Sequence, residues 1–148
     1  MGCDSYWNQR NGPGYNGTLP SLKPGALLAV PPGDAPRVAA GLATEPARRI
    51  LAALVDFGGY IVDDTGSQQG GGALCMERGV TAELRQAYNV SVAIEAPLSP
   101  AAGGASAALY WDIVAIFRAL SVVSNNGPTS VGGGGVPRQP PPPPICGA

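Results

Sequence analysis

A chain of 148 residues, 45% of them hydrophobic, is long enough for one domain with a real core. Its formal net charge is −1, so the chain lacks the excess of positive charge that is typical of nucleic-acid-binding proteins. The sequence also has no polybasic stretch of the kind that binds membrane surfaces. The absence of histidine excludes Ser-His-Asp and Cys-His catalysis and most zinc sites. Because Cys3, Cys75 and Cys146 lack a metal-binding spacing, we expect neither a metal nor another cofactor.

The 22 glycines and 16 prolines concentrate toward the two ends and in loops. Turn signals such as Asn11-Gly12-Pro13 predict an irregular N-terminal segment over residues 1–25. A Gly-rich and then Pro-rich tail occupies residues 129–148. Residues 26–128 are therefore expected to form a partial α+β domain, and no apolar run approaches the length of a membrane span.

The first regular element is a short apolar strand, Ala26–Val30, which Pro31-Pro32-Gly33 ends. Residues 34–41 are expected to be a connector with room for one helical turn. The stretch from Thr44 to Asp64 then organises the rest of the chain, as a capped amphipathic helix, a double-glycine stop and a buried strand.

In this stretch, Thr44 is predicted to be an N-cap whose hydroxyl accepts a bond from a first-turn amide. The helix continues to Phe57, and its apolar stripe consists of Ala47, Ile50, Leu51 and Leu54. Gly58-Gly59 supplies a C-terminal stop with positive φ angles. Tyr60-Ile61-Val62 favours a strand, and the helix should cover the sheet that this strand joins.

Four further elements are expected before residue 110. Ala73–Glu77 should pair back onto Tyr60–Asp64 as a hairpin, and Thr81–Tyr88 should form a short helix with Glu83 in its first turn. Val90–Ile94 fits either an edge strand or a covered loop. Leu98–Ala107 is rich in Pro, Gly, Ala and Ser and is expected to be a surface loop.

The second strong helix is predicted over Tyr110–Leu120, with Asp112 near its N-terminal end. The apolar face of this helix consists of Ile113, Ile116, Phe117 and Leu120. Ser121–Val123 either continues the helix or becomes extended. These elements predict an α+β fold in which two amphipathic helices pack on a small, mainly antiparallel sheet, with irregular N- and C-terminal segments.

Three blocks of the sequence, Pro20–Pro32, Thr44–Thr65 and Ile116–Gly135, occur in an order that resembles a known family. In these blocks the chain looks like the C-terminal half of a family of secreted, largely uncharacterised microbial β-rich proteins associated with polysaccharides. The resemblance implies an extracellular or cell-surface location and polysaccharide as a partner. Members typically carry an upstream half with a Trp/Asp-rich strand and a His-containing segment, so we expect that half to be missing here.

Candidate site residues are few. Asp63 and Asp64 are candidates for a catalytic pair of carboxylates. Adjacent residues of a strand point to opposite faces, however, so the two side chains cannot easily act on one substrate. Either one alone fits a cation or sugar-hydroxyl contact, and the alternative is a strand end that favours a turn. Trp7, Tyr60 and Trp111 are candidates for stacking on a ligand, with core packing as the alternative.

Two further sets of residues carry weaker signals. Asn16 and Asn89 begin N-glycosylation sequons, which matter only in a secreted chain. Arg138–Pro144 matches the layout of an SH3 ligand, with an extended surface tail as the alternative.

Three hypotheses for function follow. The leading one is a non-catalytic or degenerate secreted module with a structural or carbohydrate-binding role. The second is a polysaccharide-active hydrolase or lyase that uses Asp63 or Asp64. The third is an intracellular interaction protein that uses its polyproline tail.

Overall fold

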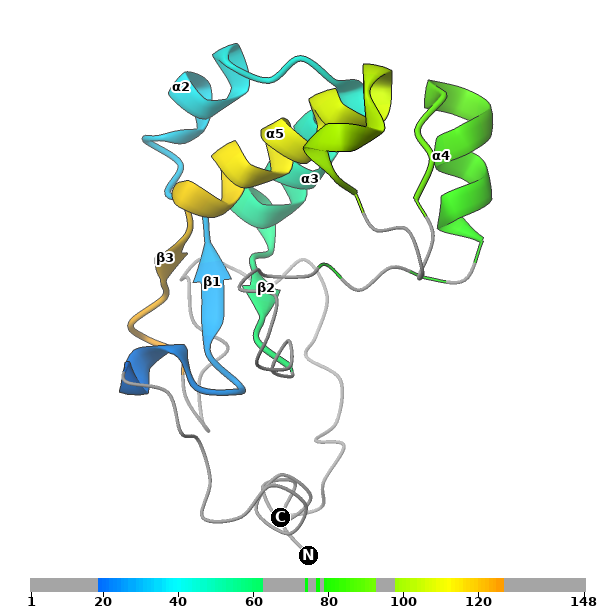
Figure 1. Cartoon of the computed structure of the whole chain (residues 1–148). Helices are drawn as coiled ribbons and strands as arrows, with labels where there is room; N and C mark the ends of the chain where they lie inside the picture. The colour runs from blue at the N-terminus through cyan, green and yellow to red at the C-terminus, as the bar shows by residue number, and fades with distance from the viewer. Residues whose placement is uncertain (1–18, 63–73, 75–76, 78, 93–97, 127–148) are drawn as a thin grey trace, which may run out of the picture.

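The computed structural model describes residues 19–62, 74, 77, 79–92 and 98–126. In these residues the fold is α+β, with four α-helices and a three-stranded antiparallel sheet. The helices gather at one end of the strands, and β1 lies between β2 and β3 (Figure 1). The elements in chain order are η1 (Pro20–Leu22), β1 (Leu27–Ala29), α2 (Ala35–Ala40), α3 (Glu45–Asp56), β2 (Gly59–Tyr60), α4 (Val80–Tyr88), η2 (Pro100–Ala102), α5 (Gly104–Arg118) and β3 (Ser121–Val122).

The sheet is built around β1, which confirms the strand predicted over Ala26–Val30. Both neighbours run antiparallel to it: Leu28 is the register partner of Gly59 in β2 and of Val122 in β3. Just past the end of β1, the amide of Val30 donates to the carbonyl of Leu54 at 3.2 Å. The central strand is thereby joined to α3 as well as to its two neighbours.

The prediction of a buried strand over Tyr60–Val62 was wrong about burial. The strand β2 is short, and the side chains of Tyr60 and Val62 are 48% and 69% exposed. The order β2-β1-β3 places β2 at an edge of the sheet, where one flank has no described neighbour. The predicted hairpin partner, Ala73–Glu77, lies largely outside the described residues, and its described members, Leu74 and Glu77, belong to no strand.

The apolar stripe of α3 faces the core, as its spacing predicts. Ala47, Leu51 and Leu54 are buried, whereas Ile50 is only partly buried at the margin. In the described part of the chain, the largest fully buried side chains are those of Ile116, Val30 and Val90. They join the stripe, together with Val38, Leu42 and Leu109, in one hydrophobic cluster. The core therefore lies between α3, α5, α2 and the end of the central strand.

The prediction of a surface loop over Leu98–Ala107 was wrong, because most of this segment is helical. A 3₁₀ turn covers Pro100–Ala102, and α5 begins at Gly104 rather than at Tyr110. The run from Ala105 to Ala108 contains three alanines, the best helix formers, and it extends the helix toward its N-terminus. At the other end, Ser121–Val122 is extended and forms β3.

The helix α4 matches the predicted Thr81–Tyr88 closely and lies at the side of the other helices (Figure 1). After it, residues 90–92 are not in a strand, so this part of Val90–Ile94 is a loop, in which Val90 is buried and Ser91 is exposed. The amide of Ser91 donates to Oγ of Ser106 at 2.9 Å. Because Ser106 belongs to α5, this bond ties the loop to the second long helix.

Gly58 makes the tight connection from α3 to β2 possible. Its φ of +70° is a conformation that L side chains rarely adopt. A Cβ at this position would lie 2.6 Å from the carbonyl oxygen of Leu28 and 2.9 Å from Cδ1 of Leu27. Glycine is therefore required here both by the backbone angle and by the close approach of β1.

Candidate functional site

Several of the predicted site residues lie outside the described part of the chain. They are the carboxylates Asp63 and Asp64, the aromatic Trp7, the sequon residue Asn16 and the proline-rich stretch Arg138–Pro144. The three cysteines also lie outside it. The candidate residues that the structure does place are Tyr60, Asn89 and Trp111.

Trp111 and Tyr60 are both at the surface, not in the core. The Trp111 side chain on α5 is 56% exposed, whereas Tyr60 lies on the edge strand β2. Tyr110 packs against Trp111 with ring centroids 5.1 Å apart and ring planes at 81°, an edge-to-face arrangement. Tyr60 takes no part in this ring contact, so the contact does not join the two candidates into one platform.

Asn89, the start of the second sequon, is exposed at the C-terminal end of α4. It has a φ of +55°, which is the left-handed conformation often found where a helix ends. Ser91, the third residue of the sequon, is exposed as well. Both polar members of this sequon are therefore accessible at the surface.

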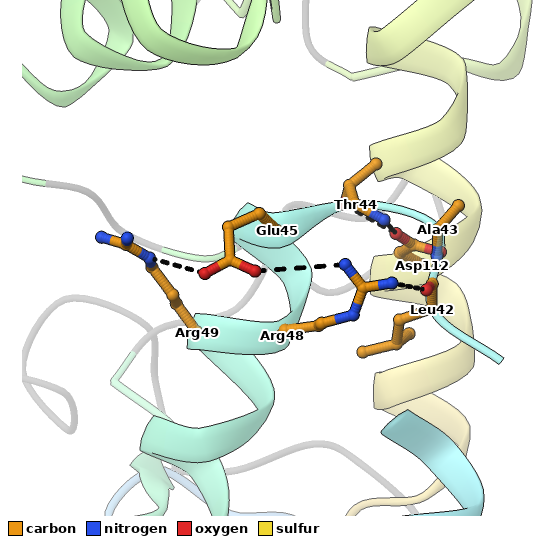
Figure 2. Close-up of polar contacts among 7 residues, drawn as sticks. All are labelled: Leu42, Ala43, Thr44, Glu45, Arg48, Arg49 and Asp112. Carbon is orange, nitrogen blue, oxygen red and sulfur yellow. Dashed lines mark hydrogen bonds and ion pairs between the residues drawn. The ribbon is translucent and has the colours of Figure 1, made fainter. Parts of the chain in front are cut away.

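The carboxylate of Asp112 accepts hydrogen bonds from the segment that leads into α3 (Figure 2). One carboxylate oxygen, Oδ1, accepts from the amide of Ala43 at 3.1 Å. The other, Oδ2, accepts from the amide of Thr44 at 2.8 Å and from its hydroxyl at 2.6 Å. Asp112 is 4% exposed, so these bonds supply the partners that a buried carboxylate needs.

Two sequence predictions are corrected at this junction. Asp112 lies in the middle of α5, because that helix begins six residues earlier than Tyr110, and so it does not serve the N-terminus of its own helix. Thr44 does occupy the N-cap position of α3, but its side chain makes no capping bond within the helix. Its hydroxyl donates to Asp112 instead of accepting from a first-turn amide.

Charged residues of the first turns of α3 surround this junction. Arg48 Nη2 donates to the carbonyl of Leu42 at 2.6 Å, and its Nη1 lies 4.0 Å from Oε2 of Glu45. Arg49 Nε donates to Oε1 of Glu45 at 3.2 Å, and this bond raises the pKa of the Arg49 guanidinium above its ordinary value. Glu45 thus holds two arginines on the outer surface of the helix (Figure 2).

An open apolar groove of about 400 Å³ runs between α2 and α3. The residues that line it are Pro32, Ala35, Pro36 and Ala39 on one side and Arg48, Leu51, Ala52, Val55 and Asp56 on the other. On each side of the groove these residues recur at intervals of three or four positions, so those on a helix lie on one face of it. The sequence prediction missed this groove, because it expected residues 34–41 to be a connector with room for one helical turn, whereas Ala35–Ala40 form the helix α2.

Among the described residues, no group of three or more Cys, Asp or Glu side chains is placed to hold a metal ion. None of the helices in the described ranges has the length and apolar character needed to cross a lipid bilayer. Comparisons of the chain with protein-family models, with curated proteins and with solved structures found no match. The resemblance to secreted polysaccharide-associated proteins therefore rests on the three sequence blocks alone.

The three described sites differ in what they can do chemically. Both oxygens of the Asp112 carboxylate accept hydrogen bonds from Ala43 and Thr44, and these bonds join the start of α3 to α5. The carboxylate is therefore poorly suited to bind a ligand. The exposed Trp111 offers an aromatic surface to a partner with apolar C–H groups. The groove offers an apolar surface with an arginine and an aspartate at its margins.

Proposed function

We propose that this protein is a non-catalytic carbohydrate-binding module of the extracellular space or cell surface, and that Trp111 is its principal contact with the sugar. The observation that carries the proposal is the exposure of Trp111, 56%, on a helix that buries Leu109 and Ile116 in the core. The resemblance of the three sequence blocks to secreted, polysaccharide-associated proteins supports the choice of ligand.

Physical chemistry favours this residue over the other exposed apolar side chains. The C–H face of a pyranose ring is apolar and flat, and an indole ring covers it with a large area at the cost of only two side-chain torsions. The polar tip of the indole remains free to hydrogen-bond a sugar hydroxyl. A binding contact of this type requires neither a metal nor a titrating group.

The surroundings of Trp111 hold its ring at the surface. Leu109 and Asp112, two residues before and one after, are buried, and Asp112 is bonded to the start of α3. This turn of α5 cannot rotate without breaking those contacts, so Trp111 stays on the outside. Tyr110 packs against the indole and restricts its rotamers, which lowers the entropy lost when a ligand binds.

Tryptophan fluorescence provides a direct test, because the chain contains only two tryptophans. In a Trp7→Phe variant, Trp111 is the sole reporter. We expect titration with a panel of neutral and acidic polysaccharides to shift its emission for at least one glycan. Trp111→Ala should abolish binding of that glycan by calorimetry, whereas Tyr60→Ala should leave the affinity unchanged. Binding that survives Trp111→Ala, or a panel without any binding, would refute the proposal.

A further inference from the structure

One exposed row of α3 has a charge pattern that the proposed sugar site does not use. Arg48, Ala52 and Asp56 follow one another at intervals of four residues and line the groove between α2 and α3. All three are exposed. The row therefore presents a cation, a small apolar residue and an anion along a length of about 12 Å, at 1.5 Å per residue.

This pattern is complementary to itself. If a second α3 lies antiparallel on the first, with a two-fold axis passing near Ala52, each Arg48 faces the Asp56 of the other copy. A parallel arrangement would instead oppose Arg48 to Arg48 and Asp56 to Asp56. Small side chains at the crossing point allow two helices to approach closely, and Ala52 lies at that point.

We propose that the α2–α3 groove is a homodimer interface, in which α3 packs antiparallel against α3 of a second copy of this chain. The partner's helix would cover the apolar groove lining, with two symmetric Arg48–Asp56 ion pairs at the rim. This is the usual anatomy of an interface, an apolar centre with a charged border. The inference is independent of the proposed sugar site, which lies on α5.

The existing contacts of Arg48 are compatible with this role. Its side chain is 47% exposed and contacts the Leu42 carbonyl and Glu45 within its own chain. A guanidinium has five N–H donors, so the group can bind a second carboxylate without giving up the bond to Leu42. These intramolecular contacts also fix its position, which reduces the entropy cost of forming an intermolecular ion pair.

Sedimentation equilibrium over about 1–500 µM protein tests the oligomeric state, with a weak dimer expected because the groove is small for an interface. We expect the mean mass to rise with concentration toward twice that of the chain. A constant monomer mass over the whole range would overturn the proposal and leave the groove to a different kind of partner.

Charge reversal in two separate variants tests the ion pairs specifically. In its own homodimer, Arg48→Glu places two carboxylates together at each pair, and Asp56→Arg places two guanidinium groups together. Each variant alone should therefore dimerise at least about tenfold more weakly. In an equimolar mixture, a dimer that contains one copy of each variant opposes unlike charges at both pairs, so dimers should reappear. If the helices were parallel, the native pairs would already be like-charged, and neither variant alone would weaken the dimer. A mixture that remains as weak as its components would refute the antiparallel arrangement.

Ala52 and Ala53 form a matched pair for a steric test, because both are exposed on α3 but only Ala52 lines the groove. Ala52→Arg should abolish the dimer by placing two arginines at the two-fold axis. Ala53→Arg, which adds the same charge one residue away, should dimerise like the native chain. Equal effects of the two variants would contradict the proposed position of the axis.

Discussion

Thr44 and Asp112 lie 68 positions apart in the sequence and are joined by two hydrogen bonds, from the Thr44 amide and hydroxyl to the same carboxylate oxygen. In a capping box, the third residue of a helix is a Glu or Gln that accepts from the amide of the N-cap residue. That position of α3 is Ala47, which has no acceptor in its side chain. Asp112 supplies the missing carboxylate from α5, close to the positive end of the α3 dipole.

Removal of this carboxylate should be costly. Asp112→Ala leaves the amides of Ala43 and Thr44 without their acceptor at a partly buried junction, and we expect a loss of about 3 kcal/mol in the free energy of unfolding. Urea denaturation monitored by circular dichroism measures it. Asp112→Asn keeps one acceptor oxygen and should cost less.

A suitable control for Asp112→Ala is Glu83→Ala, which removes an exposed carboxylate from the first turn of α4. Its cost should stay below about 1 kcal/mol, because charge–dipole interactions at exposed helix ends are weak. Equal losses for the two variants would contradict the role assigned to Asp112.

The hydroxyl of Thr44 can be tested apart from its amide. Thr44→Val keeps the shape of the side chain but removes the 2.6 Å bond to Asp112, and should cost about 1–2 kcal/mol. Thr44→Ser retains the hydroxyl and should cost less than half as much. In the Asp112→Ala background, the difference between Val and Ser should disappear, because the acceptor is gone.

The packing of α3 against the core makes Leu54 a sensitive position. Its side chain is buried in the main hydrophobic cluster, and Leu54→Ala should lower the free energy of unfolding by about 2–5 kcal/mol. Ile50→Ala, on the same helix but only partly buried, should cost less. A loss below about 0.5 kcal/mol for Leu54→Ala, the range of a surface substitution, would show that the position is not core.

Two glycines provide a matched pair for the backbone. Gly58→Ala should destabilise the protein by more than about 2 kcal/mol, because it combines a positive φ with a Cβ 2.6 Å from the Leu28 carbonyl. At Gly33 an added Cβ meets no atom within 4 Å, so Gly33→Ala should be neutral within about 1 kcal/mol. Thermal unfolding of both variants measures the difference.

The non-catalytic part of the proposed function predicts an absence of turnover. Reducing-end assays on the glycan that binds best should give no product with native protein, since glycoside hydrolysis requires two suitably spaced carboxyl groups. Asp63→Asn and Asp64→Asn should therefore leave the assay unchanged. Product formation by the native chain that is lost in either variant would establish the alternative, a polysaccharide-active enzyme.

The sequence by itself determined the local elements of the fold. The apolar spacing along Glu45–Asp56 and along the later part of α5 predicted two helices, because burial of one helix face imposes a period of 3.6 residues. The glycines after α3 predicted its end, and the short apolar run around Leu27–Ala29 predicted the central strand. Each of these signals depends on neighbours within a few residues, so it can be read along the chain.

Only the tertiary structure decided how these elements meet. The exposure of Tyr60 follows from the edge position of β2, which depends on strand order and not on the apolar character of the strand. The partner of Thr44 is 68 positions away, and it becomes an acceptor only because α5 crosses the start of α3. The groove between α2 and α3 likewise exists only once the two helices are packed together. Contacts between distant segments depend on the packing of whole helices and strands, and no local periodicity encodes that packing.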